Sequence, residues 1–232
     1  MKKVVFCTPV VKRPTKPNLD SLEASVPLLE DAGWEHYYVN EIGNPYISVA
    51  RSNMLRKALD KDPDVIVFID YDVSWKPQDL LTLIETEGDV VSGTYRFKKD
   101  EEEYMGKIYV EEDGKPIIRE DGCIKAAFIP AGFLKITNQG INKFAEAYPE
   151  LIYSTKMRPY LDLFNHGAYQ GLWYGEDYAF SRNWRDKCGD IWLIPNLDLD
   201  HNSEDKCYKG NFHEWLLRQP GGSKDPKRSE NA

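Results

Sequence analysis

The sequence predicts an α/β fold with a mainly parallel central sheet flanked by helices and a small antiparallel β addition. In the first 98 residues, apolar runs typical of strands alternate with segments of helical periodicity, a pattern that implies right-handed crossovers. One run, Val65–Ile69, is apolar without a break, as expected of a strand buried on both faces. From about Lys99 onward, hairpin turn signals separate short β-prone runs, and these predict the antiparallel part.

The sequence predicts several short helices and strands in the first 98 residues. Asp20 and Glu23 have the spacing of a capping box and predict a helix that runs toward Gly33. Apolar residues at helical spacing predict a second helix, Ile47–Leu59. The other elements expected here are the strands Val4–Cys7, His36–Val39, Val65–Ile69 and Asp89–Tyr95 and the helix Gln78–Glu85, with Pro77 in its first turn.

The second half is expected to contain hairpins, two helices and one buried strand. Asp113-Gly114 and Asp121-Gly122 are the hairpin turn signals. Residues 221–232 are polar, with Gly and Pro, and are expected to form a disordered tail. The remaining expected elements are the helices Gln139–Ala147 and Glu176–Cys188, the second ended by Gly189, and the strand Ile191–Ile194.

Composition excludes some classes of partner. Asp and Glu number 38 against 30 Lys and Arg, a net charge of −8, which argues against nucleic acid as a partner. The first apolar run is too short for a signal peptide, and no segment approaches the roughly 18 apolar residues of a membrane span. The cysteines are scattered without metal or redox spacing, which predicts reduced thiols in a cytoplasmic protein; they are Cys7, Cys123, Cys188 and Cys207.

Two carboxylates directly follow the buried run. Asp70 and Asp72 emerge at the carboxyl end of the expected strand, where open α/β sheets bind their ligands, and residues i and i+2 project to the same side of an extended chain. Their mutual repulsion requires a cation or hydrogen-bond donors nearby. A divalent metal carrying a phosphate group is the compensator that this pattern indicates. The alternative is that both carboxylates cap the following turn.

A series of short motifs extends from the first expected strand to the last. The motifs are Thr8-Pro9, Ala50-Arg51-Ser52-Asn53 on a helix, the Asp-x-Asp of Asp70 and Asp72, Ala131-Gly132-Phe133, Gly175-Glu176-Asp177, and a histidine in Asp200-His201-Asn202. Taken in this order they resemble the GT-A glycosyltransferases, which transfer a sugar from a nucleotide-sugar to an acceptor hydroxyl. An Asp-x-Asp alone is common by chance, whereas its place after a strand, with Glu-Asp and His downstream, is more specific. The resemblance covers about Val4–Asn202 and implies a Rossmann-like GT-A fold.

The resemblance implies a metal, Mn²⁺ or Mg²⁺, that stabilises the leaving diphosphate as a Lewis acid. In GT-A enzymes the last Asp of the motif binds the metal, so the resemblance implies that Asp72 is a metal ligand. The first Asp of the motif contacts the nucleotide's ribose or reaches the metal through water, so the resemblance implies one or both of these roles for Asp70. His201 would complete the metal shell, and an ordinary surface or core histidine is the alternative. Carboxylate, imidazole and phosphate ligands with water suit these ions.

The resemblance also implies a nucleotide-sugar donor, taken as a UDP-sugar because the resembled enzymes mostly use UDP. Thr8 and Pro9 would line the base pocket, although turn geometry explains them equally well. Arg51 would stack on or hydrogen-bond the nucleotide, and a helix-surface Arg paired with a carboxylate is the alternative. Gly132 would let the backbone approach the donor sugar. A further strand end, Ser92-Gly93-Thr94-Tyr95, would border the same pocket.

In inverting GT-A enzymes the Asp of the Glu-Asp motif accepts the proton of the attacking hydroxyl. This assigns Asp177 as general base, with Glu176 placing the acceptor or orienting its neighbour. The alternative is an acidic pair that merely suits the helix dipole. The aromatic residues just before the motif would be platforms for sugar rings, although Trp173 is equally well explained as core; they are Tyr169, Trp173 and Tyr174.

These expectations describe a hexosyltransferase acting on a hydroxyl of a glycan or other acceptor. The expected domain is 1–220, with a nucleotide-binding half of about 1–98 and an acceptor-side half of 99–220. The alternatives are a nucleotidyltransferase or phosphohydrolase with the same metal site, and a catalytically silent nucleotide-sugar binder. Little sequence separates Tyr95 from Ala131, so the chain is either a module of a larger polypeptide or a compact viral or bacterial enzyme. Arg96, Lys98 and Lys99 are candidates for phosphate contacts, with a solvated basic turn as the commoner explanation.

Overall fold

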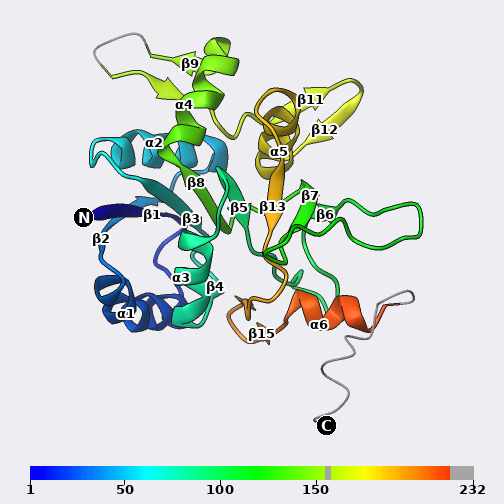
Figure 1. The fold of residues 1–232 in the computed structure, drawn as a ribbon. Helices are drawn as coiled ribbons and strands as arrows, with labels where there is room; N and C mark the ends of the chain where they lie inside the picture. Colours follow the sequence, from blue (N-terminus) through cyan, green and yellow to red (C-terminus); the bar gives the residue numbers. More distant parts are fainter. Residues whose placement is uncertain (155–157, 220–232) are drawn as a thin grey trace.

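The computed structural model describes residues 1–154 and 158–219 and is built on an eight-stranded sheet (Figure 1). The expected disordered tail at 221–232 lies outside the described residues. In spatial order the strands are β2 (Trp34–Ile42), β1 (Lys2–Val10), β3 (Val65–Ile69), β8 (Phe133–Thr137), β5 (Val90–Ser92), β13 (Ile191–Leu193), β7 (Ile124–Phe128) and β6 (Lys107–Ile108).

The sheet is mainly parallel, as predicted, but it contains a strand that the sequence did not reveal. β1 pairs parallel with β2 and β3, and β13 pairs parallel with β5. β8 lies antiparallel between β3 and β5, and β7 and β6 extend the sheet by antiparallel pairing. The sequence of β8 includes Lys135, whose side chain is buried with Nζ donating to the carbonyl of Thr86. That charge interrupts the apolar run by which a central strand is recognised.

Alternation along the inner strands produces one core on each side of the sheet. In β1, Val4 and Phe6 face one core while Val5 and Cys7 face the other, as expected for side chains of period two. Helices α1 (Lys16–Asp31) and α3 (Pro77–Glu85) cover the first core, and they lie together below the sheet in Figure 1. The second core is covered by α2 (Ile47–Leu59), α4 (Asn138–Ala147) and α5 (Glu176–Lys187).

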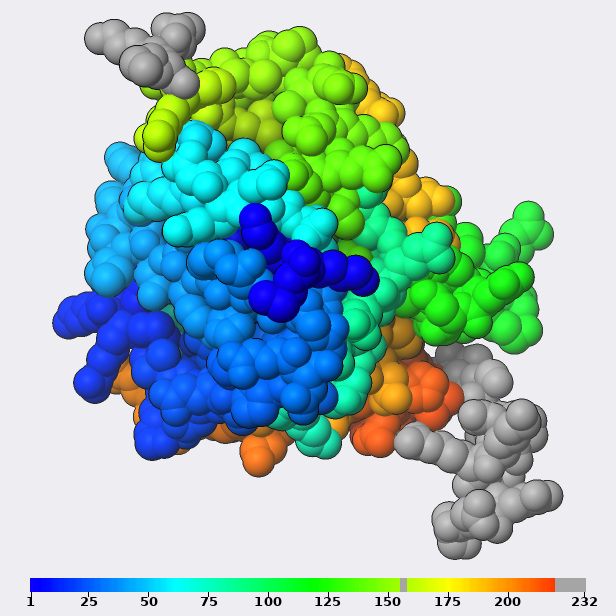
Figure 2. Space-filling model, turned by 60° about the vertical axis from the view of Figure 1, so that its left-hand side comes forward, coloured from blue at the N-terminus to red at the C-terminus, as the bar shows by residue number. Residues whose placement is uncertain are grey.

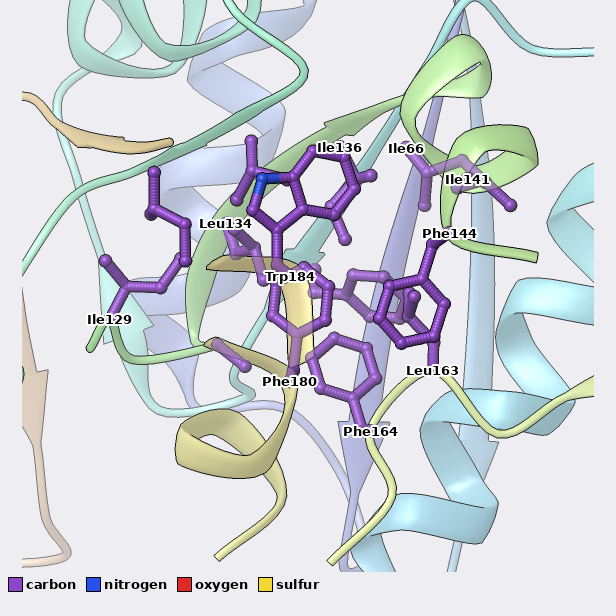
Figure 3. Close-up of a cluster of buried hydrophobic side chains, with 14 of the residues drawn as sticks. Ile66, Ile129, Leu134, Ile136, Ile141, Phe144, Leu163, Phe164, Phe180 and Trp184 are labelled. Atoms are coloured by element: carbon purple, nitrogen blue, oxygen red, sulfur yellow. The ribbon is translucent and has the colours of Figure 1, made fainter. Parts of the chain in front are cut away.

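The second core is rich in aromatic rings. Figure 3 shows side chains from α4, α5 and the segment before α5 gathered against β8. Phe164 packs against Phe68 of β3 and against Phe180 of α5, with ring centroids 5.0 and 5.1 Å apart. Such pairs add stability beyond the apolar area they bury. This packing fixes the start of α5 relative to the end of β3.

The predicted boundaries agree with the structure where the pattern is strong and shift where it is weak. Helix α2 and strand β3 begin and end at the predicted residues, and Gly189 follows α5 with a φ of +130°. The capping box predicted at Asp20 is wrong. Helix α1 begins earlier, because the Thr15 side chain accepts a hydrogen bond from Asn18 N and Pro17 suits the first turn.

Short strands form smaller sheets beside the central one. A three-stranded sheet contains β4 (Val73–Ser74), β14 (Asp200–Asn202) and β15 (Cys207–Tyr208), and two hairpins are formed by β9 (Ile152–Tyr153) with β10 (Tyr160–Leu161) and by β11 (Gly167–Tyr169) with β12 (Leu172–Tyr174). A short helix, α6 (Phe212–Leu217), and a 3-10 turn, η1 (Pro149–Leu151), are also present. These pieces confirm the antiparallel addition.

The segment between β6 and β7 projects from the body, as the green loop at the right of Figure 1 and Figure 2 shows. It contains both predicted turns, where Gly114 and Gly122 have φ values of +83° and +87°. Among the described residues, no helix combines the length and the apolar character needed to span a membrane.

Candidate active site

A pocket of about 230 Å³ lies at the carboxyl ends of β1 and β3. Most of the residues singled out from the sequence contribute to its wall: Pro9, Arg51, Asp70, Asp72, Glu176 and His201. Of the others, Thr8 is buried in β1, Gly132 packs against Asp70, and Asp177 is the neighbour of Glu176. A larger hollow of about 730 Å³ between α1 and α6 contains none of these residues. The structure therefore brings the predicted motifs together at the carboxyl ends of the inner strands.

Arg51 lies at the centre of the acidic side of this pocket. Its side chain is only 2 % exposed, so it is not the helix-surface arginine of the alternative. Nη2 donates to Asp70 Oδ1 at 2.8 Å and lies 3.7 Å from Glu176 Oε1. Burial alone would lower the pKa of Arg51, but the two carboxylates outweigh it and raise this pKa. Arg51 thus keeps both carboxylates at the pocket wall, and its predicted contact with a nucleotide stays a prediction.

Asp70 is held on its other side by Tyr95, which the sequence placed only at the border of the pocket. The Tyr95 hydroxyl donates to Asp70 Oδ2 at 3.1 Å, while Asp70 N donates to the carbonyl of Gly132 at 3.0 Å. A Cβ added at Gly132 would overlap the Tyr95 hydroxyl and the Asp70 carboxylate. Glycine is therefore required here because the carboxylate approaches the backbone closely. Both oxygens of Asp70 have protein partners, so its role as a metal ligand stays a prediction.

The turn that carries both carboxylates is fixed by two asparagines. Asn18 Nδ2, buried in the first turn of α1, donates to the carbonyls of Asp70 (3.1 Å) and Val73 (2.8 Å). Asn202 donates to the carbonyl of Asp72 through its backbone N at 2.7 Å and its Nδ2 at 3.0 Å. Asn18 was missed from the sequence, because a polar residue early in a helix gives no sign of a distant backbone partner.

Asp72 and His201 face each other because β14 pairs with β4. The antiparallel register places His201 opposite Val73, so that His201 Nε2 lies 3.6 Å from Asp72 Oδ1. His201 Nδ1 lies 2.8 Å from the carbonyl oxygen of Arg96. Because that oxygen can only accept, Nδ1 carries a proton. Nε2 is then the ring nitrogen that faces the Asp72 carboxylate.

Asp72 is also ion-paired with Lys98, from the loop after β5. Its side chain is 11 % exposed. Burial raises the pKa of Asp72, but the nearby His201 and the ion pair with Lys98 together outweigh burial, and the net pKa is lowered. Asp72 is therefore an ionised carboxylate with the Lys98 ammonium on one oxygen and the His201 imidazole facing the other. Lys98 is part of the site, which the sequence left open.

The donor set fits a divalent ion that shares a phosphorylated ligand. The Asp72 carboxylate faces Nε2 of His201, and the other ring nitrogen, Nδ1, is fixed by a backbone carbonyl. Metal-binding histidines are commonly held in this way. In residues 1–154 and 158–219, no three His, Cys, Asp or Glu side chains come together to hold a metal. Asp72 and His201 would thus supply two ligands, and phosphate oxygens and water would supply the others.

Asp177 lies in the first turn of α5, where its Oδ1 accepts a hydrogen bond from Tyr178 N at 2.8 Å. Burial, and then the negative charge of Glu176, raise the pKa of Asp177 to about 6. The helix dipole alone would have the opposite effect, because it favours the charged form. Asp177 is ionised at neutral pH yet has a high proton affinity, as suits a general base.

The β11–β12 hairpin leads directly into α5 and exposes its aromatic side chains. Trp173 is 73 % and Tyr169 46 % exposed, so the core explanation of Trp173 is wrong. Arg182 of α5 lies over the rings of Tyr169 and Tyr174, 4.1 and 4.6 Å from their centroids. These cation–π contacts tie the hairpin to the helix that carries Glu176 and Asp177.

Arg51→Met should lower the free energy of unfolding by about 3 kcal/mol, because removing one partner of a buried ion pair leaves uncompensated charge. Urea unfolding at pH 7 measures this loss. Arg56→Met is the matched control on the same helix: its i,i+4 pair with Asp60 is more exposed, and its loss should stay below about 1 kcal/mol. Equal losses in both variants would contradict the central role of Arg51.

Asp177→Asn should raise the free energy of unfolding at pH 7.5 by about 1–2 kcal/mol, since each unit of pKa shift is worth about 1.4 kcal/mol and the group is partly exposed. The raised pKa of Asp177 means that its ionised form costs stability above pH 6, and that this cost fades as the pH falls toward 4. Unfolding curves at pH 7.5 and pH 4.5 test the sign. Asp186→Asn, on the exposed face of α5, should leave stability nearly unchanged at both values.

No protein-family model matches the chain, and no curated protein matches it in sequence. Among solved structures, it is similar to a mutant of Drosophila β-1,4-galactosyltransferase 7 in complex with manganese, UDP-Gal and xylobiose, with 13 % identity and a TM-score of 0.48 over 99 % of this chain and 79 % of that one. It is also similar to a glycosyltransferase involved in glycosylation of the major capsid of PBCV-1, with 10 % identity and a TM-score of 0.36 over 64 % of this chain and 66 % of that one. A third similar structure is GalNAc-T7 with UDP, GalNAc and Mn²⁺, with 11 % identity and a TM-score of 0.44 over 87 % of this chain. The match spans 44 % of that chain, less than half of its length.

Proposed function

We propose that the chain is a metal-dependent glycosyltransferase of the GT-A type, moving a hexosyl group from a nucleotide diphosphate sugar to a hydroxyl. The observation that carries this is the facing pair of Asp72 and His201 at the carboxyl end of the β3 strand, in one pocket with Glu176 and next to Asp177. Sugar transfer needs a cation site and a proton acceptor, and this pocket offers the Asp72–His201 pair and, next to Glu176 in the chain, the raised-pKa carboxylate of Asp177. The pair would hold the cation that stabilises the leaving diphosphate, and Asp177 would take a proton from the acceptor.

On the donor side, Asp72 and His201 would hold Mn²⁺ or Mg²⁺. When bound, the ion supplies positive charge for the diphosphate that leaves. Pro9 lines the pocket at the end of β1 and is assigned to the base pocket with Thr8 behind it. Arg51 and Gly132 keep the Asp70 carboxylate in place beside the ribose that it is proposed to bind. UDP is the nucleotide proposed.

On the acceptor side, Asp177 is the general base and Glu176 is the carboxylate that orients the acceptor. The base removes the hydroxyl proton as the oxygen attacks the sugar's anomeric carbon, and a single displacement of this kind inverts the configuration there. Exposed aromatic rings on the hairpin before α5 suit a carbohydrate acceptor, because flat apolar faces pack well on sugar rings. Residues 99–220 are therefore proposed as the acceptor-side half of a 1–220 domain. Four free cysteines support a cytoplasmic location.

Asp72→Asn should remove the Mn²⁺-dependent part of the stabilisation by UDP. A ligand at 100 times its dissociation constant adds about 2.7 kcal/mol to the folded state, which thermal unfolding detects. The quantity compared is the melting temperature with UDP and Mn²⁺ minus that with UDP alone. Asp113→Asn, in an exposed hairpin turn, is the control and should retain this difference. A full difference in Asp72→Asn would rule out Asp72 as a ligand, and a panel with GDP, CDP and ADP would identify the nucleotide.

Asp177→Asn should bind donor like the wild type and lose transfer by about 10²–10⁴-fold, the contribution typical of a general base. In the wild type, kcat/KM should rise with pH to a plateau above about pH 6, where Asp177 is deprotonated. UDP release, assayed across pH with and without sugar acceptors, follows both effects. Release without any acceptor would favour a hydrolase, and donor binding without release would favour the silent binder. Undiminished transfer by Asp177→Asn would eliminate it as the base.

A further inference from the structure

Lys98 is ion-paired with Asp72, the carboxylate that we propose as a metal ligand. Its Nζ forms an ion pair with Asp72 Oδ2, while His201 Nε2 lies 3.6 Å from the other oxygen, Oδ1. The Lys98 side chain is 32 % exposed, whereas that of Asp72 is 11 % exposed. The ammonium therefore reaches in from the rim to a carboxylate that lies deeper. A solvated basic turn, the commoner explanation of this segment, does not describe that contact.

The loop that carries Lys98 is fastened at both ends. Phe97 N donates to the carbonyl of Glu103 at 3.0 Å, and Met105 N donates to that of Tyr95 at 3.0 Å. The Arg96 guanidinium donates to the carbonyls of Lys99, Asp100 and Lys209 at 3.0–3.4 Å. The loop is thus closed on itself and joined to the segment after β15, which leaves the side chain of Lys98 as its movable part.

The same loop also fixes the second metal ligand. The carbonyl oxygen of Arg96, two residues before Lys98, holds His201 Nδ1 at 2.8 Å. The imidazole and the ammonium are therefore positioned against Asp72 by one short segment. Lys98 can leave Asp72 by rotation of its flexible side chain while the backbone that orients His201 stays in place.

A dication and the ammonium on the two oxygens of Asp72 repel each other, because like charges a few ångströms apart interact strongly in a partly buried site. Metal binding at Asp72 therefore favours release of Lys98. The displaced ammonium keeps its charge and its tether at the pocket rim, where a diphosphate bound to the metal would place several negative oxygens. Lysine binds phosphate well as a point charge.

We propose that Lys98 is a positioning residue that exchanges Asp72 for the diphosphate of the donor when metal and nucleotide bind together. This rests on the function proposed above. Without nucleotide, Lys98 competes with the metal, so the metal alone binds weakly. With nucleotide, Lys98 gains a new anionic partner, so each ligand strengthens the binding of the other, as linkage requires. The exchange makes the site select a metal–nucleotide pair over free metal.

The test measures binding, not turnover. Mn²⁺ alone is titrated into the full chain and followed by the loss of the free-ion electron paramagnetic resonance signal, and UDP is then titrated by calorimetry at saturating Mn²⁺. Lys98→Gln should bind Mn²⁺ alone about tenfold more tightly and Mn²⁺–UDP about tenfold more weakly. Lys98→Arg keeps the charge and should restore weak binding of the metal alone. Lys99→Gln is the matched control, since Lys99 pairs with Glu103, and it should behave like the wild type.

The outcomes separate this inference from the function on which it rests. Equal Mn²⁺ affinity in the wild type and Lys98→Gln, with UDP still bound, would overturn the exchange and leave the glycosyltransferase proposal standing. Weaker binding of Mn²⁺ alone in Lys98→Gln would also overturn it, since Lys98 would then support the site structurally. Absence of both Mn²⁺ and UDP binding in every variant would overturn both proposals.

Discussion

The buried guanidinium of Arg51 holds the acidic side of the pocket together. Asp70 and Glu176 come from distant parts of the chain, and their like charges oppose bringing them to one wall. Arg51 offsets that repulsion from inside the protein, where Phe68 and Phe164 enclose it, with ring centroids 5.8 and 5.3 Å from the guanidinium carbon. The carboxylates are thereby fixed before any ligand arrives, and fixed polar groups of this kind contribute most to catalysis.

The side of the pocket formed by Asp72 and His201, the proposed metal ligands, depends on strand register instead of charge. β14 pairs with β4 over two residues only, yet this pairing decides which side chain of the segment faces Asp72. A slip by one residue would present Asp200 or Asn202 in place of His201, since neighbours in a strand point to opposite faces. The two hydrogen bonds from Asn202 to the carbonyl of Asp72 resist that slip. A strand pairing too short to be stable alone is thus held in the register that places His201 opposite Asp72.

The sequence was most predictive where one local pattern sufficed. The uninterrupted run of β3 and the helical spacing of α2 identified both elements to the residue, and Asp70 and Asp72 were found because they follow that run directly. Their convergence with Arg51, Glu176 and His201 came from the family resemblance, since no local rule predicts contacts over such separations. The sequence named Tyr95 at the border of the pocket and Lys98 as a phosphate candidate, but not their contacts with Asp70 and Asp72, which depend on the tertiary fold. Tyr95 and Lys98 are ordinary residues in a loop until the fold places Asp70 and Asp72 beside them.

Strand β8 has a consequence for how the protein can be divided. β3 and β5, both from the first 98 residues, do not pair with each other, because β8 lies between them. A chain that ended before residue 133 would therefore expose two inner strand edges, which are templates for aggregation. Gly132, directly before β8, is also the residue that the Asp70 carboxylate approaches closely. The portion assigned to the nucleotide and the portion assigned to the acceptor are interleaved, and recombining them between homologues would have to exchange β8 together with the strands on either side.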